Sequence, residues 1–229
     1  MHYEDKLHLP DAVRTLAFRL GAQADADRSC VRLTQHGSLR EGPTDRWRHF
    51  RAHQCIALQR PAFEWNATTG PLGSISVIDA LVDGRPRLEV KLFRCIRLAR
   101  LAGGIGAAKG ELMRYLAELA WAPDAILANR KLDWTVPDAK TMRVNATLGQ
   151  VCAQIDFSLN SEGRIDTVMA RDRPRWENGG FVERPWHGHF SDYRLEQKRW
   201  LPFRGEVGWT VDGVAFTAWK GNIDTWAVA

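Results

Sequence analysis

Hydrophobic and polar residues alternate one by one along most of the chain. Val31 and Leu33 share one phase, whereas Arg32 and Thr34 share the other. A period of two places successive side chains on opposite faces of an extended backbone, so this pattern predicts β-strands with one apolar face. The predicted strands number about ten and span residues 30–40, 47–58, 63–68, 74–82, 87–95, 142–148, 151–159, 165–171, 186–194, 203–211 and 214–219.

Tight-turn sequences separate several of these strands. Asp83-Gly84 and Asp212-Gly213 each stand between two alternating runs, and Gly149-Gln150 joins the clearest pair of strands. Glycine accepts the positive φ of a two-residue hairpin turn, so these sequences predict antiparallel hairpins.

Two segments follow the helical period instead. Residues 10–20 begin with Pro10 and Asp11, which suit a first helical turn, and end before Gly21. Residues 110–123 form the longest helical pattern, and a short further turn is predicted at residues 125–128. The apolar stripe of the central segment consists of Leu112, Met113, Leu116, Leu119 and Ala120.

These elements predict a mainly β (α+β) fold in one domain spanning residues 1–229. The strands would form a single strongly curved antiparallel sheet, a half-barrel of about ten strands. The N-terminal and central helices would cover its concave face and leave a pocket there. The glycine-rich residues 101–106 lack the pattern of a phosphate-binding loop and are predicted to be a linker or lid.

Composition is that of an ordinary soluble protein, with 45% hydrophobic and 26% charged residues among 229. The net charge of +5 is mild, and no long block of like charges or nucleic-acid-binding motif is present, which argues against a nucleic-acid partner. The ten tryptophans are unusual. Most are expected in the core, and the others suit the wall of an amphipathic cavity.

Metal and cofactor motifs are absent. The four cysteines have no metal-binding spacing, and the histidine pairs at residues 187 and 189 and at 49 and 53 lack a third ligand. The sequence therefore predicts neither a metal nor a cofactor. The first residues contain acids and no long apolar run, which predicts no secretion signal and no membrane span. Together with the scattered thiols, this favours a cytoplasmic protein.

The central helix has a second, polar face that could carry chemistry. Glu111 lies four residues before Tyr115, and Arg114 lies four residues before Glu118, so each pair projects from one side of the helix. Trp121 follows on that face. If the face is solvated, it carries weak surface ion pairs. If it lines a cavity, two carboxylates, a phenol and a guanidinium could anchor a ligand or exchange protons.

Two charged residues interrupt apolar strand faces. Asp79 shares a phase with Val77 and Leu81, and Arg171 continues the row of Ile165, Thr167 and Met169. Buried charges are seldom left unpaired, because removing them from water is costly. Both side chains are therefore expected to face the charges of the central helix, either as a structural tie or as a polar anchor for a ligand.

Three functions remain open. The first is binding of a hydrophobic or amphipathic small molecule in a Trp-lined pocket, and the second is an acid/base enzyme (lyase, isomerase or hydrolase) that acts on a hydrophobic substrate there. The third is an interaction protein without a pocket; oligomeric state is left open. The candidate catalytic residues are Glu111, Arg114, Tyr115 and Glu118. The candidate ligand-binding residues are Trp65, Asp79, Trp121 and Arg171.

Motifs spread along nearly the whole chain resemble an uncharacterised bacterial family of the domain-of-unknown-function type. The principal one is Gly110-Glu-Leu-Met-Arg-Tyr-Leu-Ala-Glu118 with Trp121 and Pro123, and Arg60-Pro-x-Phe-x-Trp65 is another. The order of elements is also similar to that of LolA-type half-barrel lipoprotein carriers, which hold acyl chains between a curved sheet and a helical lid. This similarity implies a cavity and does not by itself assign a function.

Overall fold

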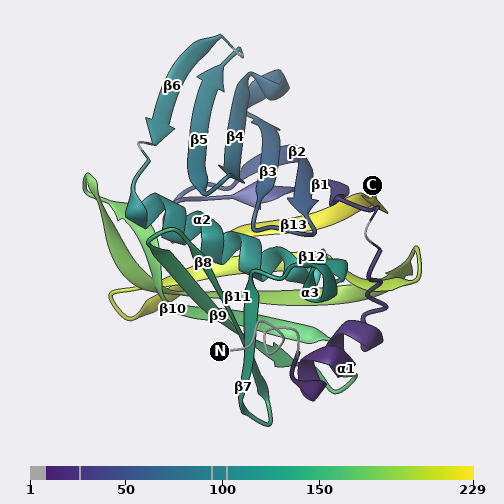
Figure 1. Cartoon of the computed structure of the whole chain (residues 1–229). Helices are drawn as coiled ribbons and strands as arrows, with labels where there is room; N and C mark the ends of the chain where they lie inside the picture. Colours follow the sequence, from purple (N-terminus) through teal and green to yellow (C-terminus); the bar gives the residue numbers. More distant parts are fainter. Residues whose placement is uncertain (1–8, 26, 94, 102) are drawn as a thin grey trace.

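A computed structural model describes residues 9–25, 27–93, 95–101 and 103–229 (Figure 1). Residues 1–8 lie outside this part, and the prediction of no secretion signal rests partly on them. Ala102 of the predicted linker also lies outside it. None of the described helices is long and apolar enough to cross a membrane.

One antiparallel sheet dominates the described chain. It contains thirteen strands in the order β6-β5-β4-β3-β2-β1-β13-β12-β11-β10-β9-β8-β7, so two meanders join where β1 pairs with β13. The strands are β1 Cys30–Leu39, β2 Arg48–Ala57, β3 Phe63–Thr69, β4 Ile75–Val82, β5 Arg85–Leu92, β6 Ile96–Leu101, β7 Leu132–Asp138, β8 Thr141–Leu148, β9 Val151–Leu159, β10 Ile165–Glu177, β11 Gly180–Glu196, β12 Arg199–Val211 and β13 Val214–Val228. The predicted curved antiparallel fold is confirmed.

The predicted number of about ten strands was too low. Both edge strands, β6 and β7, are additional to the predicted set. Pro137 lies in β7, where it cannot donate a hydrogen bond to a neighbouring strand, and an edge strand tolerates this. Residue 101 belongs to β6 rather than to a linker.

The helical segment crosses the concave face because of the strand order. Strand β6 is one edge of the sheet and β7 is the other, so the chain between them must span the whole sheet. It does so through α2 Ile105–Ala117, the 3₁₀ turn η3 Glu118–Ala120 and α3 Asp124–Ala128 (Figure 1). Helix α2 begins at residue 105, before the predicted start at 110. The remaining helices are α1 Asp11–Arg19 and the 3₁₀ turn η2 Pro71–Gly73.

The apolar stripe of α2 joins the two meanders into one core. Leu112, Met113 and Leu116 have no exposed surface, and the helix contacts β8, β9 and β10 on one side and β4 and β5 on the other. Burial of a large aliphatic side chain contributes about 1.5–3 kcal/mol relative to exposure. The same contacts hold the polar face of α2 against the sheet.

Irregularities in β10 change which of its side chains face the core. The pairing with β9 shifts between Ile165 and Thr167, and the pairing with β11 shifts between Ala170 and Arg173. Each shift alters the alternation of faces, so Val168 is buried and Arg171 is exposed. The expectation that Arg171 faces the helix was therefore wrong, and Arg173 occupies that place.

Candidate functional site

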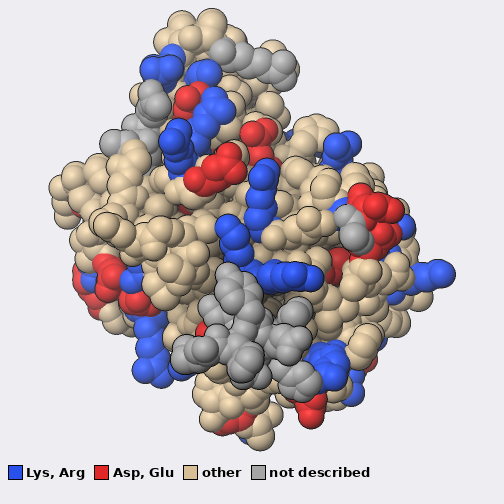
Figure 2. All heavy atoms as spheres, in the orientation of Figure 1, with Lys and Arg blue, Asp and Glu red and all other residues tan. Residues whose placement is uncertain are grey.

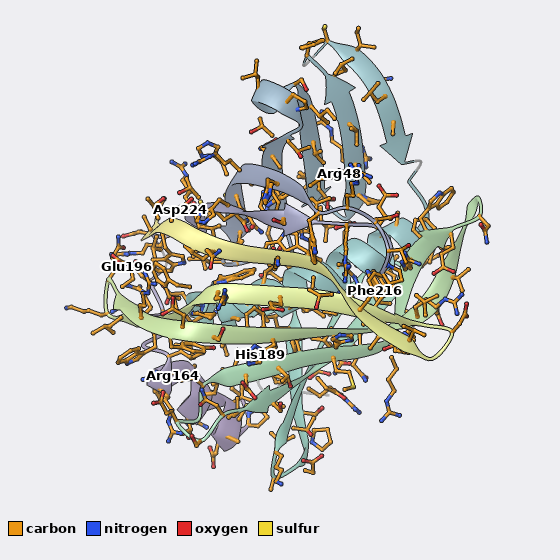
Figure 3. The ribbon with its side chains drawn as sticks, turned by 180° about the vertical axis from the view of Figure 1, so that it is seen from behind. Arg48, Arg164, His189, Glu196, Phe216 and Asp224 are labelled. Carbon is orange, nitrogen blue, oxygen red and sulfur yellow. The ribbon has the colours of Figure 1, made fainter. Side chains whose placement is uncertain are left out.

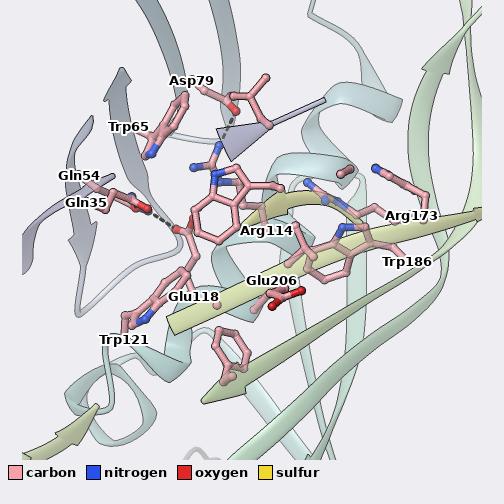
Figure 4. Close-up of a pocket in the computed structure, with 18 of the residues that line it drawn as sticks. Gln35, Gln54, Trp65, Asp79, Arg114, Glu118, Trp121, Arg173, Trp186 and Glu206 are labelled. Atoms are coloured by element: carbon pink, nitrogen blue, oxygen red, sulfur yellow. Dashed lines mark hydrogen bonds and ion pairs between the residues drawn. The ribbon is translucent and has the colours of Figure 1, made fainter. Parts of the chain in front are cut away.

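A cavity of about 320 Å³ lies between the concave face of the sheet and α2 (Figure 4). This volume is at the lower end of the range for small-molecule sites. Its wall is strongly aromatic, and half of the ten tryptophans contribute to it. The aromatic lining residues are Trp65, Trp121, Trp186, Phe190, Trp209 and Trp219.

Trp121 is fixed in this wall. Its ring packs edge-on against Phe190, with 5.4 Å between centroids, and against Trp219 at 6.2 Å. Its Nε1 donates a hydrogen bond of 2.8 Å to the carbonyl of Pro202. By contrast, the buried Nε1 atoms of Trp65 and Trp186 have no hydrogen-bond partner among the described residues. Such groups are costly to bury unpaired, so an occupant able to accept hydrogen bonds would be favoured.

A chain of polar contacts crosses the cavity from the sheet to the helix. Arg114 donates from Nε to Glu118 at 2.8 Å and from its terminal nitrogen to Asp79 (Figure 4). The other carboxylate oxygen of Glu118 accepts a hydrogen bond of 2.6 Å from the side-chain amide of Gln54. The side-chain oxygen of Gln54 in turn accepts a hydrogen bond of 2.7 Å from the side-chain amide of Gln35. These groups hold one another in fixed orientations.

The guanidinium of Arg114 is deep in the protein but keeps 19% of its side-chain surface because it borders the cavity. The Phe63 and Trp65 rings lie 4.6 and 5.3 Å from it. Burial alone would lower its pKa, but the nearby carboxylates, first Glu118 and then Asp79, outweigh this and raise the pKa. Arg114 is therefore a permanent cation.

Glu111 is the carboxyl group most altered by its surroundings. Burial and, secondly, the charge of Asp79 raise its pKa to about 8, although Arg114 and Arg173 act in the opposite direction. Its Oε2 is buried and has no hydrogen-bond partner among the described residues. Glu111 lies beside the lining residues rather than among them and is mostly protonated at neutral pH.

Arg173 reaches the cavity from β10. Its Nε donates a hydrogen bond of 3.3 Å to the carbonyl of Gly110, and its guanidinium stacks 4.5 Å from the Trp186 ring and 5.3 Å from Trp209. A Cβ atom at residue 110 would lie 3.4 Å from the carbonyl oxygen of Pro174, which is ordinary van der Waals contact, so strand and helix are close neighbours here. Burial lowers the pKa of Arg173 below its ordinary value.

Five of the eight predicted site residues line the cavity: Trp65, Asp79, Arg114, Glu118 and Trp121. Tyr115 lies elsewhere, where its hydroxyl donates to the carbonyl of Ala57 at 3.0 Å and accepts from Asn129 at 2.8 Å. Its side chain is fully buried, and this burial raises its pKa. Arg171 is exposed and does not line the cavity.

Four polar lining residues were missed by the sequence analysis: Gln35, Gln54, Arg173 and Glu206. Gln54 interrupts the buried row of Phe50, Ala52 and Ile56, and Gln35 continues the row of Val31 and Leu33. This is the same signal that identified Asp79, and it could have found both glutamines. Arg173 is the next residue of the row that contains Arg171, but the predicted strand ended at residue 171, and the irregularities of β10 place Arg173 rather than Arg171 at the cavity.

The histidines predicted to occupy an outer face include His189, which lies on the convex face 3.3 Å from Asp166 (Figure 3). Among the described residues no three His, Cys, Asp or Glu side chains gather as a group that could hold a metal. Lysine and arginine are interspersed with acids on the face in Figure 2, in agreement with the mixed charge pattern of the sequence.

Residues 7–227 match the model of a family of unknown function (DUF6920). No curated protein matches the chain. A domain from Vibrio parahaemolyticus named for outer membrane lipoprotein sorting is 12% identical, with a TM-score of 0.55 over 95% of this chain and 91% of that one. A DUF1329 family protein from Desulfovibrio piger is 12% identical, with a TM-score of 0.53 over 95% and 92%. A LolA superfamily protein from Nitrosomonas europaea is 8% identical, with a TM-score of 0.49 over 95% and 93%.

At such low identity the first two structures show a shared fold and nothing more. They confirm the predicted half-barrel fold. The family match confirms the predicted resemblance to an uncharacterised family.

Proposed function

Because this chain belongs to the DUF6920 family, whose function is unknown, we propose its function from the cavity itself: it binds a hydrophobic or amphipathic small molecule between the curved sheet and α2. The observation that carries this proposal is the cavity of about 320 Å³, with an aromatic wall and a group of fixed charges on one side. Apolar pockets with a few oriented polar groups are typical of small-molecule sites.

The shared fold with a domain named for lipoprotein sorting gives further support to a lipid-like ligand. The proposed place of action is the cytoplasm, which is supported by the absence of disulfide bonds among the four cysteines.

A substitution that fills the cavity should abolish binding. Val77 on β4 lines the cavity, so Val77→Trp places an indole inside it. We expect the affinity for the neutral dye Nile red to fall about tenfold or more, because the lost space must be regained by distorting the packed wall. The measurement is a fluorescence titration of the dye, together with native mass spectrometry of the purified protein to detect a retained ligand.

The matched control is Ile78→Trp, since Ile78 is the next residue on the same strand and does not line the cavity. The Ile78→Trp variant should bind Nile red with the affinity of the wild type. Equal binding by Val77→Trp and the wild type would show that the dye occupies another site and would contradict the proposal.

The acid/base enzyme remains a second proposal because of Glu111, whose pKa is raised to about 8 mainly by burial. A group that titrates near neutral pH can both accept and donate a proton. Two observations favour binding instead: Tyr115 is held by Ala57 and Asn129, and Glu118 is engaged by Arg114 and Gln54. Recovery of the bound molecule unchanged after long incubation would support binding, and conversion that disappears in Glu111→Gln would support the enzyme.

A further inference from the structure

The two arginines that border the cavity differ in their ion pairs. Asp79 and Glu118 both bind Arg114, whereas no carboxylate among the described residues forms an ion pair with Arg173. Glu206 also borders the cavity, but its register partners on β11 and β13 are His189 and Lys220. Both partners are exposed, so the carboxylate of Glu206 belongs to the convex face.

Other deeply placed arginines show what Arg173 lacks. Arg199, which is 2% exposed, binds both oxygens of Asp124, and Arg114 binds two carboxylates. Within the described part of the chain, Arg173 has one hydrogen-bond acceptor, the carbonyl of Gly110, and two indole rings. Indole faces stabilise a cation but leave the donors on the edge of the guanidinium available. A partly buried arginine without a carboxylate partner favours an anionic ligand.

The balance of charge limits what that partner can be. Arg114 and Arg173 together balance Asp79 and Glu118, so with Glu111 protonated this group of side chains is neutral before a ligand binds. A dianion would add excess negative charge beside these two carboxylates. A carboxylate carries a single charge and matches the planar fork of a guanidinium with two parallel hydrogen bonds.

We propose that the cavity selects hydrophobic carboxylic acids, with the carboxylate bound by Arg173 beside Trp186 and the apolar part enclosed by the other tryptophans. This inference rests on the proposed function and names the chemical class of its ligand. The polar site is built from α2, β4 and β10: Arg114 of α2 binds Asp79 of β4, and α2 meets β10 at Gly110.

A proton on Glu111 is linked to this binding. The charged groups that act on Glu111 are Asp79 from β4, Arg114 and Glu118 from the helical segment, and Arg173 from β10. Its pKa of about 8 means that it is mostly neutral below that pH and negative above it. When ionised, it competes with the ligand for Arg173 and repels the carboxylate. Affinity for the acid therefore declines above pH 8, by up to about tenfold per pH unit.

The test compares decanoate, decanol and decylamine as competitors of Nile red, because they share one alkyl chain and differ in the head group. In the wild type at pH 7, decanoate should bind about tenfold or more tightly than decanol, as expected for a charged hydrogen-bonded pair, and decylamine should bind most weakly. Arg173→Gln should remove the preference for decanoate and leave decanol unchanged. Arg171→Gln is the matched control, since Arg171 lies on the same strand but is exposed, and it should retain the preference.

A second measurement does not depend on a variant. Calorimetry of decanoate binding to the wild type near pH 8, in two buffers of different ionisation enthalpy, should show uptake of a fraction of a proton. Decanol binding should show none, and Glu111→Gln should abolish the uptake.

The outcomes separate the two proposals. Equal affinity for decanoate and decanol, or tighter binding of decyl phosphate than of decanoate, overturns the carboxylate proposal and leaves hydrophobic binding intact. Failure of all these compounds and of Nile red to bind contradicts the proposed function itself. An equal loss of decanoate and decanol affinity in Arg173→Gln shows a structural role for Arg173 and also overturns the carboxylate proposal.

Discussion

Replacing Arg199 with methionine should lower the free energy of unfolding by about 3–5 kcal/mol, because it leaves the carboxylate of Asp124 buried without its cation. The two side chains are each 2% exposed. Arg199 donates from Nε at 3.1 Å and from its terminal nitrogen at 2.7 Å to the two oxygens of Asp124, and Gln23 binds both residues. Chemical denaturation of the wild type and the variant measures the difference.

The pair joins β12 to α3 and to the segment that follows α1, so it fixes the end of the helical crossing rather than the cavity. The control is Arg48→Met, which breaks an exposed ion pair of 3.0 Å with Glu41. Loss of such a pair should cost less than about 1 kcal/mol. Similar losses in the two variants would contradict the importance of burial. The double variant Asp124→Leu, Arg199→Met should recover part of the loss, because no unpaired charge remains.

Replacing Glu111 with glutamine should stabilise the protein at alkaline pH by roughly 3–5 kcal/mol at pH 9. Burial raises the pKa of Glu111 from 4.5 to about 8, so the native state holds its proton to a higher pH than the unfolded state. The stability that this proton contributes is fully present below about pH 4.5 and is lost as the pH rises to about 8. Glutamine resembles the protonated acid and does not titrate.

Denaturant unfolding should therefore give similar stabilities for the variant and the wild type at pH 5. At pH 9 the variant should be clearly more stable than the wild type. The control is Glu162→Gln, because Glu162 is exposed and should leave the pH dependence unchanged. If the stabilities of the wild type and of Glu111→Gln change in parallel between the two pH values, Glu111 is ionised at neutral pH, contrary to its raised pKa. The same result would remove the proton linkage proposed for ligand binding.

The candidate site was predictable only where a regular element carried it. The spacing of Arg114 and Glu118 on a helix and the phase of Asp79 in a strand both follow from local geometry, and the structure brings the three together. Tyr115 shows the limit of this reasoning. It is one residue from Arg114, but its hydroxyl is held by Ala57 and Asn129, and the helical pattern does not reveal which neighbours surround each side of the helix.

The sequence by itself determined the strand-rich class, most hairpins and the apolar stripe of the central helix, because these depend on periodicity and on turn residues within a few positions. The tertiary structure alone decided three features: the pairing of β1 with β13, the crossing of α2 over the concave face, and the entry of Arg173 in place of Arg171. The first two depend on contacts between residues far apart in the chain. The third depends on shifts of strand register, each of which alters the alternation of faces and leaves no mark in the pattern of the sequence.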